Sequence, residues 1–271
     1  MPELPEVETI RFQLDEQTPI TIIGMELSQV VGSILKVQEF DPKGKIISHI
    51  ERKGKLLDII LSDDFHILSH LGMSGSWRIS REKVNEKHTH LQFEGLDKNK
   101  RTIYLAYIDP RRFGNMYFVK STSAQKHLDK LGVDIGSRDF TPHYVYEVLK
   151  KYPTRQLKVH LLDQKFFAGC GNYIASEICA RAGIRPTRRC GKVTKKECQD
   201  IVRATDEVLN PIMKSNGLTF SGGYSDTSGE KGEGLQHLVV FWQKECQMCG
   251  GPVKKIILAQ RGTFYCPHCQ R

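Results

Sequence analysis

The sequence CQMCGGPVKKIILAQRGTFYCPHC, residues 246–269, carries the most specific structural signal in the chain. Cys246 and Cys249 form one CxxC pair, Cys266 and Cys269 form a second, and 16 residues separate the pairs. Each pair can supply two corners of a tetrahedron, and a hairpin of this length brings the pairs together. We therefore expect a C-terminal zinc ribbon with one structural Zn²⁺; iron or a redox role is the alternative.

The ribbon is too short to have much core of its own, so its folding should depend on the metal. The expected tip of its hairpin is Gln260–Thr263, which presents Arg261. Arg261 is either a solvated turn residue or a cation that the rigid ribbon presents to a phosphate group. The ribbon alone does not decide between these two interpretations.

The sequence before the ribbon is helical in pattern. Thr141-Pro142 places an N-cap residue before a proline at the first helical position, and Thr194 with Glu197 has the spacing of a capping box. Pro211 should kink the last helix or end it early. After this helix, residues 218–236 are rich in glycine and serine and predict a flexible loop.

The first part of the chain predicts one helix followed by strands. An amphipathic helix over residues 3–16 is indicated by one apolar stripe, formed by Leu4, Val7, Ile10 and Leu14. Residues 20–120 have the pattern of strands, with turns expected at Asp63-Asp64 and near residues 96–100. This pattern is typical of a β-sandwich, and the chain as a whole is expected to be α+β with two domains. We place the boundaries at 1–125 for the β-rich domain, 126–235 for the helical domain and 236–271 for the ribbon.

The charge of the chain is unevenly distributed. The formal net charge is +9; residues 1–150 contain 21 basic and 21 acidic residues, whereas residues 151–271 contain 19 and 10. This imbalance favours a polyanionic partner such as nucleic acid, although an inert basic surface would look the same. We find no apolar run of the roughly 20 residues that span a membrane and no signal peptide, so we expect an intracellular protein. The remaining cysteines lack pair spacing and are expected to be small buried apolar groups: Cys170, Cys179, Cys190 and Cys198.

The N-terminus, MPELPEVETI, has a chemical interpretation as well as a structural one. If Met1 is removed, Pro2 exposes a secondary amine that can attack an electrophilic carbon and form an iminium ion. An α-amino group with a pKa of about 8 is roughly one tenth neutral at pH 7, far more than an ordinary lysine. Glu3 would supply an acid beside it, and Glu6, one helical turn further on, could also reach the site. The structural alternative is that Pro2 only begins a helix and the glutamates favour its dipole.

Six short motifs in one order resemble a known family. They are PELPEVET at the N-terminus, RKGKLL at 52–57, SHLGMSGSWR at 69–78, DPRRFG at 109–114, GCGNYIASE at 169–177 and the ribbon. Together they cover essentially the whole chain and resemble the bacterial formamidopyrimidine-DNA glycosylases, within the wider group that includes endonuclease VIII. The resemblance implies an N-terminal helix with a β-sandwich, then a helix-two-turn-helix domain that bears the zinc ribbon. It also implies a monomeric enzyme of the bacterial cytoplasm that binds damaged double-stranded DNA.

The resemblance assigns roles to residues that match the motifs. Pro2 matches the nucleophile, Glu3 the catalytic acid, and Lys55 and Arg261 the residues of the two successive eliminations. The matching DNA contacts are His88, Arg111 and Asn172. A further family lysine contact falls on Pro153, and Lys151 or Lys158 is expected to substitute for it.

Three residues match those that fill the gap left by a flipped nucleotide: Met73, Arg111 and Phe113. An apolar wedge and a cation suit this task, although Met73 and Phe113 could equally be core residues. This set favours the formamidopyrimidine branch over the endonuclease VIII branch.

The implied activity is bifunctional. A glycosylase step would remove an oxidised base (a formamidopyrimidine, 8-oxoguanine or an oxidised pyrimidine), and lyase steps of β- and δ-elimination would follow. The sequence departs from the family after Gly222-Gly223, where the loop that covers a flipped base is shorter than usual, and at Phe241–Lys244, which replaces a Tyr-Gly-Arg-like stretch. An abasic-site lyase and a non-catalytic zinc protein that binds damaged DNA are the alternative functions.

Overall fold

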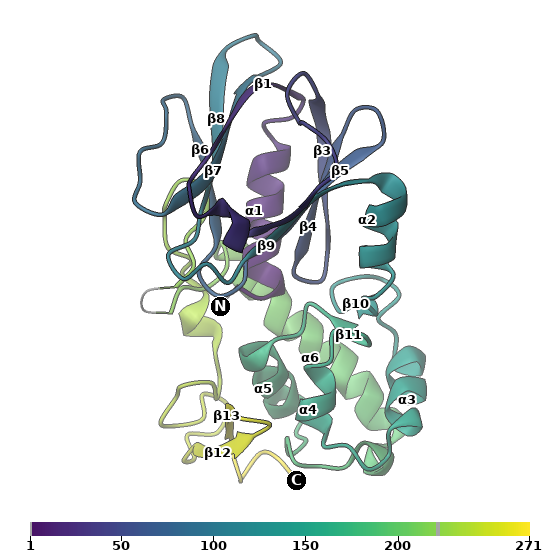
Figure 1. Cartoon of the computed structure of the whole chain (residues 1–271). Helices are drawn as coiled ribbons and strands as arrows, with labels where there is room; N and C mark the ends of the chain where they lie inside the picture. Colours follow the sequence, from purple (N-terminus) through teal and green to yellow (C-terminus); the bar gives the residue numbers. More distant parts are fainter. Residues whose placement is uncertain (1, 221–222) are drawn as a thin grey trace. The chain divides into compact units, whose positions relative to one another are not determined.

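The computed structural model describes residues 2–220 and 223–271, and its contacts divide the chain into two compact units. The first unit contains the residues up to 130 together with 215–233. The second contains 131–214 together with 234–271. Figure 1 labels the elements of both units.

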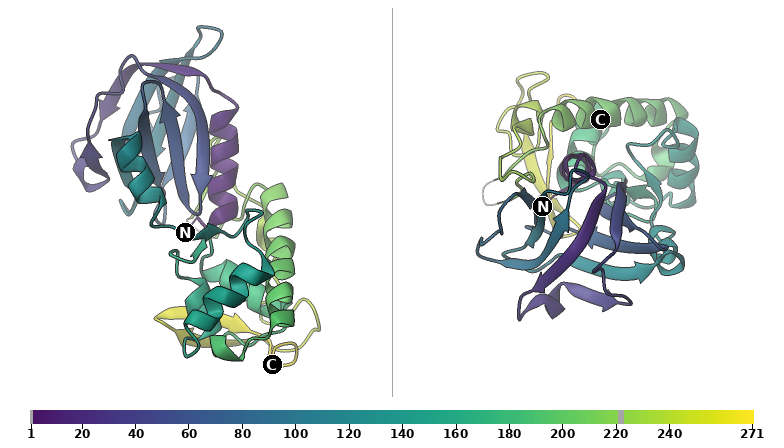
Figure 2. Two further views of the ribbon diagram at one scale, coloured as in Figure 1. Left: turned by 90° about the vertical axis from the view of Figure 1, so that its right-hand side faces the viewer. Right: turned by 90° about the horizontal axis from the view of Figure 1, so that it is seen from above.

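The first unit contains a helix, a nine-stranded sheet and a second short helix. The elements are α1 (Leu4–Asp15), β1 (Ile20–Leu27), η1 (Val31–Ser33), β2 (Leu35–Gln38), β3 (Ile46–Lys53), β4 (Leu56–Leu61), β5 (Phe65–His70), β6 (Ser76–Ser80), β7 (Thr89–Leu96), β8 (Thr102–Ile108), β9 (Asn115–Lys120) and α2 (Ser121–Leu128). The strand order is β2-β9-β5-β4-β3-β1-β7-β8-β6, and the sheet curls into two layers (Figure 2). This arrangement confirms the predicted sandwich.

One apolar core fills the space between the layers. It contains Ile59 from β4, Phe93 from β7 and Phe118 from β9, and α1 adds Val7 and Ile10. The apolar stripe of α1 is therefore buried in this core, as the helical spacing predicts. Burial of a large aliphatic or aromatic side chain contributes about 1.5–3 kcal/mol, so this core is the main source of stability in the unit.

The expected turns of the sheet are present. Asp63 and Asp64 both have a φ of 60°, the left-handed pair of a tight hairpin turn, and join β4 to β5. This turn sets the register in which Leu56 pairs with His70. In the turn between β7 and β8, the Asp97 carboxylate accepts hydrogen bonds from the N–H groups of Asn99 and Arg101.

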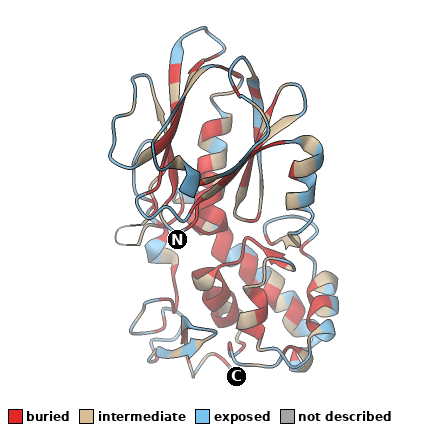
Figure 3. Cartoon of the chain, viewed as in Figure 1, coloured by how far each residue is buried: buried red, intermediate tan, exposed pale blue. Residues whose placement is uncertain are grey.

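The second unit is helical and ends in a two-stranded ribbon. Its elements are β10 (Val133–Asp134), α3 (Pro142–Lys151), α4 (Leu157–Leu161), β11 (Phe167–Ala168), α5 (Asn172–Arg181), η2 (Cys190–Lys192), α6 (Lys195–Lys214), η3 (Gly234–His237), β12 (Lys254–Leu258) and β13 (Arg261–Tyr265). Helix α5 is the central element, because its residues from Tyr173 to Ala180 are all buried (Figure 3). The four cysteines outside the ribbon are buried, as predicted.

The helix starts in this unit follow the sequence signals. The Thr141 side chain accepts a hydrogen bond from the Tyr144 N–H at the start of α3. At α6, the Thr194 N–H donates to the Glu197 carboxylate and the Glu197 N–H donates to the Thr194 hydroxyl, which completes the predicted capping box. The expectation that Pro211 ends α6 early is wrong, because the helix continues to Lys214. Pro211 removes one backbone donor, and burial of neighbouring apolar residues keeps the last turn helical.

None of the helices in the described residues is long and apolar enough to cross a membrane.

Candidate functional site

The N-terminal segment of the first unit is fixed in place rather than frayed. Pro2 and Glu3 are buried, and Glu3 is the N-cap of α1. Glu6 Oε2 accepts a hydrogen bond of 2.8 Å from the Glu3 N–H, and Glu6 Oε1 accepts one of 2.9 Å from the Leu218 N–H. One buried carboxylate thus holds both the start of the chain and the segment after α6. The sequence suggested that Glu6 could reach the site of Pro2 and Glu3. In the structure it lies there and orders the backbone of both segments.

Gly217 allows this close approach. Its φ is +79°, and a Cβ at this position would lie 3.0 Å from Glu6 Cγ. A larger residue would therefore be strained in its backbone and would press on the carboxylate that orders the N-terminus.

Lys55 lies in the short turn between β3 and β4, and an arginine connects this turn to α1. Arg52 Nε donates to Glu8 Oε2 over 2.7 Å, and Arg52 Nη1 donates to the Gly54 carbonyl over 2.8 Å. Burial alone would raise the pKa of Glu8, but its bonds to Arg11 and Arg52 hold it below its usual value. The paired charges keep the Lys55 turn in a fixed position relative to the N-terminal helix.

His70 is a candidate site residue that the sequence reasoning missed. It is the last residue of β5, and its Nδ1 accepts a hydrogen bond of 3.1 Å from the Gly72 N–H. Burial, with a smaller effect of the Lys55 ammonium, lowers the pKa of His70 to about 4. The ring is therefore neutral near pH 7 and carries its proton on Nε2, where it can donate to an anion. The signal was available, because the turn at Asp63-Asp64 brings residue 70 opposite residue 56, beside Lys55.

Two adjacent loops of the first unit present the three residues expected to fill a gap in DNA. Met73 is 37% exposed, Phe113 is 53% exposed, and Arg111 is also exposed. The Arg111 guanidinium carbon lies 4.9 Å from the centre of the Phe113 ring, a cation–π contact. The alternative that Met73 and Phe113 are core residues is therefore wrong.

The buried Asp109 carboxylate organises these loops. Its Oδ1 accepts hydrogen bonds from the Ser74 hydroxyl at 2.6 Å and from the Arg111 N–H at 3.3 Å, and its Oδ2 accepts from the Gly114 N–H at 2.8 Å. The first bond ties the loop that carries Met73 to the loop that carries Arg111 and Phe113. Glycine is required where the loops meet, because a Cβ at Gly72 would lie 2.4 Å from the Phe113 backbone.

His88 lies beside the same loops. It has a φ of +70° and is exposed, and its carbonyl accepts a hydrogen bond of 3.1 Å from the Asp109 N–H. This bond sets the position of the predicted DNA contact relative to Asp109.

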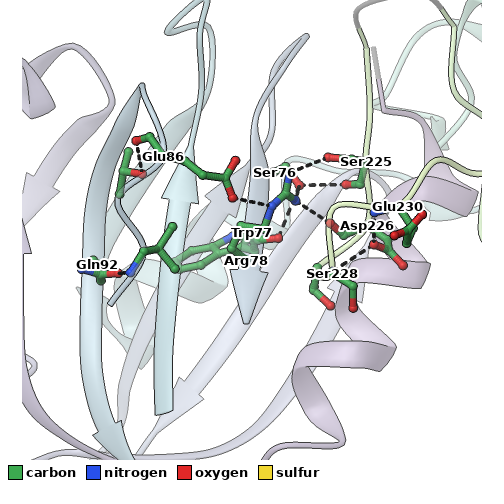
Figure 4. Close-up of polar contacts among 12 residues, drawn as sticks. Ser76, Trp77, Arg78, Glu86, Gln92, Ser225, Asp226, Ser228 and Glu230 are labelled. Carbon is green, nitrogen blue, oxygen red and sulfur yellow. Dashed lines mark hydrogen bonds and ion pairs between the residues drawn. The ribbon is translucent and has the colours of Figure 1, made fainter. Parts of the chain in front are cut away.

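The segment expected to be a flexible loop is extensively hydrogen-bonded in residues 223–233. Arg78 on β6 donates to the Asp226 carbonyl over 2.6 Å and to the Ser225 hydroxyl over 3.0 Å (Figure 4). The Ser76 hydroxyl donates to the Ser225 carbonyl, and the Ile79 N–H donates to the carbonyl of Thr227. The neighbouring residues 221–222 lie outside the described part of the chain, so the double glycine at the start of this loop is described only from Gly223.

In the second unit, Lys158 departs from its predicted role. Its side chain is buried, and its Nζ donates to Asn172 Oδ1 over 2.6 Å and to Thr263 Oγ1 over 2.9 Å. Lys158 is thus not a surface DNA contact; its burial is possible because two oxygen acceptors meet its ammonium. It instead joins α4 to the N-terminus of α5 and to the ribbon.

Asn172 and Arg261 are brought to the same region of this unit. Asn172 is the first residue of α5, and its Nδ2 donates to the Gly262 carbonyl over 3.1 Å. Arg261 directly precedes Gly262 and is exposed at the tip of the ribbon hairpin. The helix N-terminus and the arginine both favour an anion.

The ribbon cysteines form a four-thiol cluster. The Sγ atoms of Cys246, Cys249, Cys266 and Cys269 all lie within 4.8 Å of one another. The Cys246–Cys269 and Cys249–Cys266 Sγ distances are 3.9 Å and 3.6 Å. A tetrahedral zinc with bonds of about 2.3 Å to sulfur requires sulfur atoms about 3.8 Å apart, so the cluster fits one structural Zn²⁺.

Two side chains attach the ribbon to the helices. Glu177 of α5 accepts hydrogen bonds of 2.7, 2.9 and 2.8 Å from the N–H groups of Val239, Val240 and Phe241. Burial raises the pKa of Glu177, although these donors favour its ionised form. Gln270 Nε2 donates to the Ile184 carbonyl over 2.8 Å. The ribbon that presents Arg261 is therefore held to α5 by hydrogen bonds as well as by its own fold.

Three family models match successive parts of the chain. Residues 1–116 match the formamidopyrimidine-DNA glycosylase N-terminal domain, and residues 131–221 match the H2TH domain of the same enzymes. Residues 243–271 match a zinc finger found in FPG and IleRS.

Similar proteins cover the full length of the chain. The formamidopyrimidine-DNA glycosylase of Syntrophomonas wolfei is 35% identical over 278 residues, which cover 100% of both chains. A structure of Lactococcus lactis FPG (MutM) with DNA containing an oxidised pyrimidine has a TM-score of 0.87 at 30% identity and covers 100% of both chains. A structure of MutM with DNA containing carbocyclic 8-oxo-G also has a TM-score of 0.87, at 30% identity and with 100% of both chains covered.

Proposed function

Since the chain belongs to the formamidopyrimidine-DNA glycosylase family, we propose that it excises oxidised bases from DNA and cleaves the strand through an iminium intermediate at Pro2. Members of this family are bifunctional glycosylase/lyases of base-excision repair. The observation that carries the residue assignment is the buried Pro2-Glu3 pair, which Glu6 holds at the start of α1.

The first step joins Pro2 to the damaged nucleotide. After removal of Met1, the lone pair of the Pro2 nitrogen attacks C1′ of the deoxyribose, and the glycosidic bond breaks with its electrons leaving on the base, which takes up the proton that the Pro2 nitrogen loses. Glu3 donates a proton to the sugar ring oxygen, so the ring opens and the iminium ion forms. The ordered N-terminus supports this step, because a fixed nucleophile requires less loss of entropy at the transition state.

The next steps break the strand. The iminium ion acidifies C2′; loss of a proton from this carbon expels the 3′ phosphate, and a second elimination expels the 5′ phosphate. Lys55 is suited to the first elimination and Arg261 to the second, because each places a cation near a phosphate. The neutral His70 and the backbone N–H groups at the N-terminus of α5, which begins at Asn172, are suited to bind phosphate as hydrogen-bond donors. Lys158 supports this indirectly, as a positioning residue for Asn172.

The exposed loops of the first unit that carry Met73, Arg111 and Phe113 would stabilise DNA from which a nucleotide has been flipped. Extrusion of a nucleotide costs a few kcal/mol of unstacking, and Met73 and Phe113 can fill the space that it leaves. Arg111 can pair with the orphaned base, and His88 contacts the DNA beside these loops. The partner is therefore double-stranded damaged DNA, and the basic second half of the chain provides the attraction.

The zinc ion supplies structure and no chemistry. When bound by Cys246, Cys249, Cys266 and Cys269, it fixes the ribbon and hence the position of Arg261. We place the enzyme in the bacterial cytoplasm, since its relatives are bacterial proteins, and we propose that it acts as a monomer.

Borohydride trapping tests this proposal. The purified protein is incubated with duplexes that carry 8-oxoguanine, a formamidopyrimidine, 5-hydroxycytosine or a plain abasic site, with Pro2→Gly as the matched control. We expect a covalent adduct on at least one damaged base, and none with Pro2→Gly. An adduct only on the abasic duplex would mean that the protein is an abasic-site lyase without glycosylase activity. No adduct on any duplex, with Met1 shown by mass spectrometry to be absent, would leave a DNA-binding protein.

A further inference from the structure

Trp242 has a conformation and an exposure that the fold alone does not require. It lies in the segment between η3 and the ribbon, it is 65% exposed, and its φ is +61°. A bulky residue in the left-handed region is strained, and a large exposed aromatic ring gains little from burial. Strain of this kind is concentrated at binding and catalytic sites, where the surrounding structure holds it in place.

The indole packs against a cluster of aromatic side chains. Its ring stacks on Phe241, with centroids 6.2 Å apart and planes only 8° from parallel. Phe241 is itself buried: its N–H donates to Glu177, and its ring meets the edge of Phe264 on β13 at 5.0 Å. Tyr173, the residue after Asn172, also contacts Phe241, at 6.3 Å. Trp242 is therefore presented in a fixed orientation, with much of its surface open to solvent.

The same aromatic cluster connects Trp242 to the region of Asn172 and Arg261, which favours an anion. Phe264 lies in the strand that begins with Arg261 and includes Gly262, whose carbonyl is held by Asn172. The Lys255 Nζ lies 5.7 Å from the centre of the Phe264 ring. Exposed Lys244 is two residues from Trp242, and the exposed carboxylate of Glu245 beside it offsets part of this charge. Trp242 is thus linked through the Phe241 ring to the elements that carry Asn172 and Arg261, because this ring contacts both Tyr173 and Phe264.

We propose that Trp242 is a stacking platform for a nucleobase of the DNA strand bound at Asn172 and Arg261. The proposal rests on the proposed function, since that function brings DNA to this unit. An indole face stacks on any base, and Lys255 and Lys244 add attraction for the neighbouring phosphates. The contact would contribute most where the base stack of the DNA is interrupted, as it is around a flipped or missing base.

The tryptophan content of the chain provides a direct readout. The sequence contains two tryptophans, and the other, Trp77, is fully buried in the core of the first unit. We expect a duplex with a reduced abasic site to quench and blue-shift the emission of the exposed Trp242 as it binds. The variant Trp242→Phe should lose this signal and keep most of the affinity.

Three substitutions separate stacking from structure. Trp242→Gly removes the ring and relieves the left-handed strain, and it should weaken the Kd about 5- to 150-fold, the equivalent of the ~1–3 kcal/mol of base–aromatic stacking. Its melting temperature should stay the same or rise. Trp242→Leu keeps apolar bulk without a π face and should bind as weakly as Trp242→Gly, whereas Trp242→Phe should bind nearly as the unsubstituted protein does.

Equal affinity of the unsubstituted protein, Trp242→Gly and Trp242→Leu would overturn the platform. So would weak binding by Trp242→Gly together with a lower melting temperature and a similar loss in Trp242→Phe, since that combination describes a structural role. Borohydride trapping at saturating abasic DNA distinguishes this failure from failure of the proposed function. Trapping by Pro2 in the unsubstituted protein, without any effect of Trp242, would reject the platform alone.

Discussion

Asp109 provides a sharp test of how the loops of the first unit act. In Asp109→Asn, an amide NH₂ must replace one carboxylate oxygen. The arrangement that keeps the 2.8 Å bond from the Gly114 N–H turns the NH₂ toward the Ser74 hydroxyl, which can rotate to accept. The substitution then loses the 3.3 Å bond from the Arg111 N–H, which keeps its 3.2 Å bond to the Ser74 hydroxyl, and converts a short charge-assisted bond of 2.6 Å into a neutral one. We expect a loss of about 2 kcal/mol.

This loss should appear as disorder of the loops that carry Met73, Arg111 and Phe113. If all of it opposes the ordered loops, their population falls by about 30-fold relative to the disordered state. Excision of an oxidised base requires flipping and should slow by up to this factor in kcat/KM. Cleavage at an abasic site should slow much less, because a nucleotide without a base is cheaper to unstack.

Asp97→Asn is the matched control. Asp97 also uses a carboxylate to accept N–H bonds in a turn of the same sheet, from Asn99 and Arg101, but its turn carries none of the site residues. Both variants should be less stable to urea, and only Asp109→Asn should change the ratio of lesion excision to abasic cleavage. An equal fall of both activities in Asp109→Asn, or no fall at all, would refute the reasoning.

Three further outcomes are expected. Arg78→Ala removes the bonds to Ser225 and Asp226 and should change the ranking of lesions in a competition assay, with abasic-site cleavage unchanged. Removal of zinc by chelation or by Cys249→Ser should release one metal ion per chain, which metal analysis checks, and should weaken DNA binding at least tenfold. The fluorescence of the buried Trp77 should keep its wavelength, because the first unit stays folded. In the folded protein the pKa of His70 is about 4, against an ordinary 6.5 in the unfolded chain. Between pH 4 and pH 6.5 the unfolded state therefore binds more protons than the folded state. The free energy of unfolding is highest above pH 6.5 and falls as the pH is lowered toward 4. In urea unfolding, His70→Gln should remove up to about 3 kcal/mol of this pH dependence.

The sequence predicts most accurately where the signal is local. The caps at Thr141 and Thr194, the turn at Asp63-Asp64 and the cysteine cluster depend on residues a few positions apart or on one hairpin. In each case the residue type satisfies a backbone group or a metal without help from the rest of the fold. Of the two outcomes expected at Pro211, a kink or an early end of α6, the early end does not occur, since burial of that helix face outweighs the local cost of the proline.

The interpretations that failed depended on partners far along the chain. Lys158 was expected to substitute for a family lysine contact that falls on Pro153, but Asn172 and Thr263 supply acceptors for its ammonium that only the fold brings together. Glycine and serine in residues 218–236 suggested flexibility, but Arg78 on β6 holds the part of the loop around Asp226. Composition carries no information on such distant partners.

Three buried carboxylates have a common role in the structure. Each accepts backbone N–H bonds from a segment without regular structure that carries proposed functional residues: Glu6 beside Pro2, Asp109 beside Arg111, and Glu177 beside Trp242. A carboxylate suits this task because its two oxygens can accept several N–H groups at once, and such bonds are stronger than neutral ones.

This common role predicts that the three carboxylates can be separated by their effects. Glu6→Gln should slow iminium formation at saturating DNA, because the amide NH₂ must face one of the two N–H donors that order the N-terminus. Glu177→Gln should instead weaken the Kd for DNA and leave the trapping rate at saturation close to that of the unsubstituted protein, since its donors attach the ribbon to α5 and do not order the N-terminus. Single-turnover trapping over a range of DNA concentrations measures both quantities. If both variants lowered the same parameter by the same factor, the carboxylates would stabilise the fold in general rather than position separate functional segments.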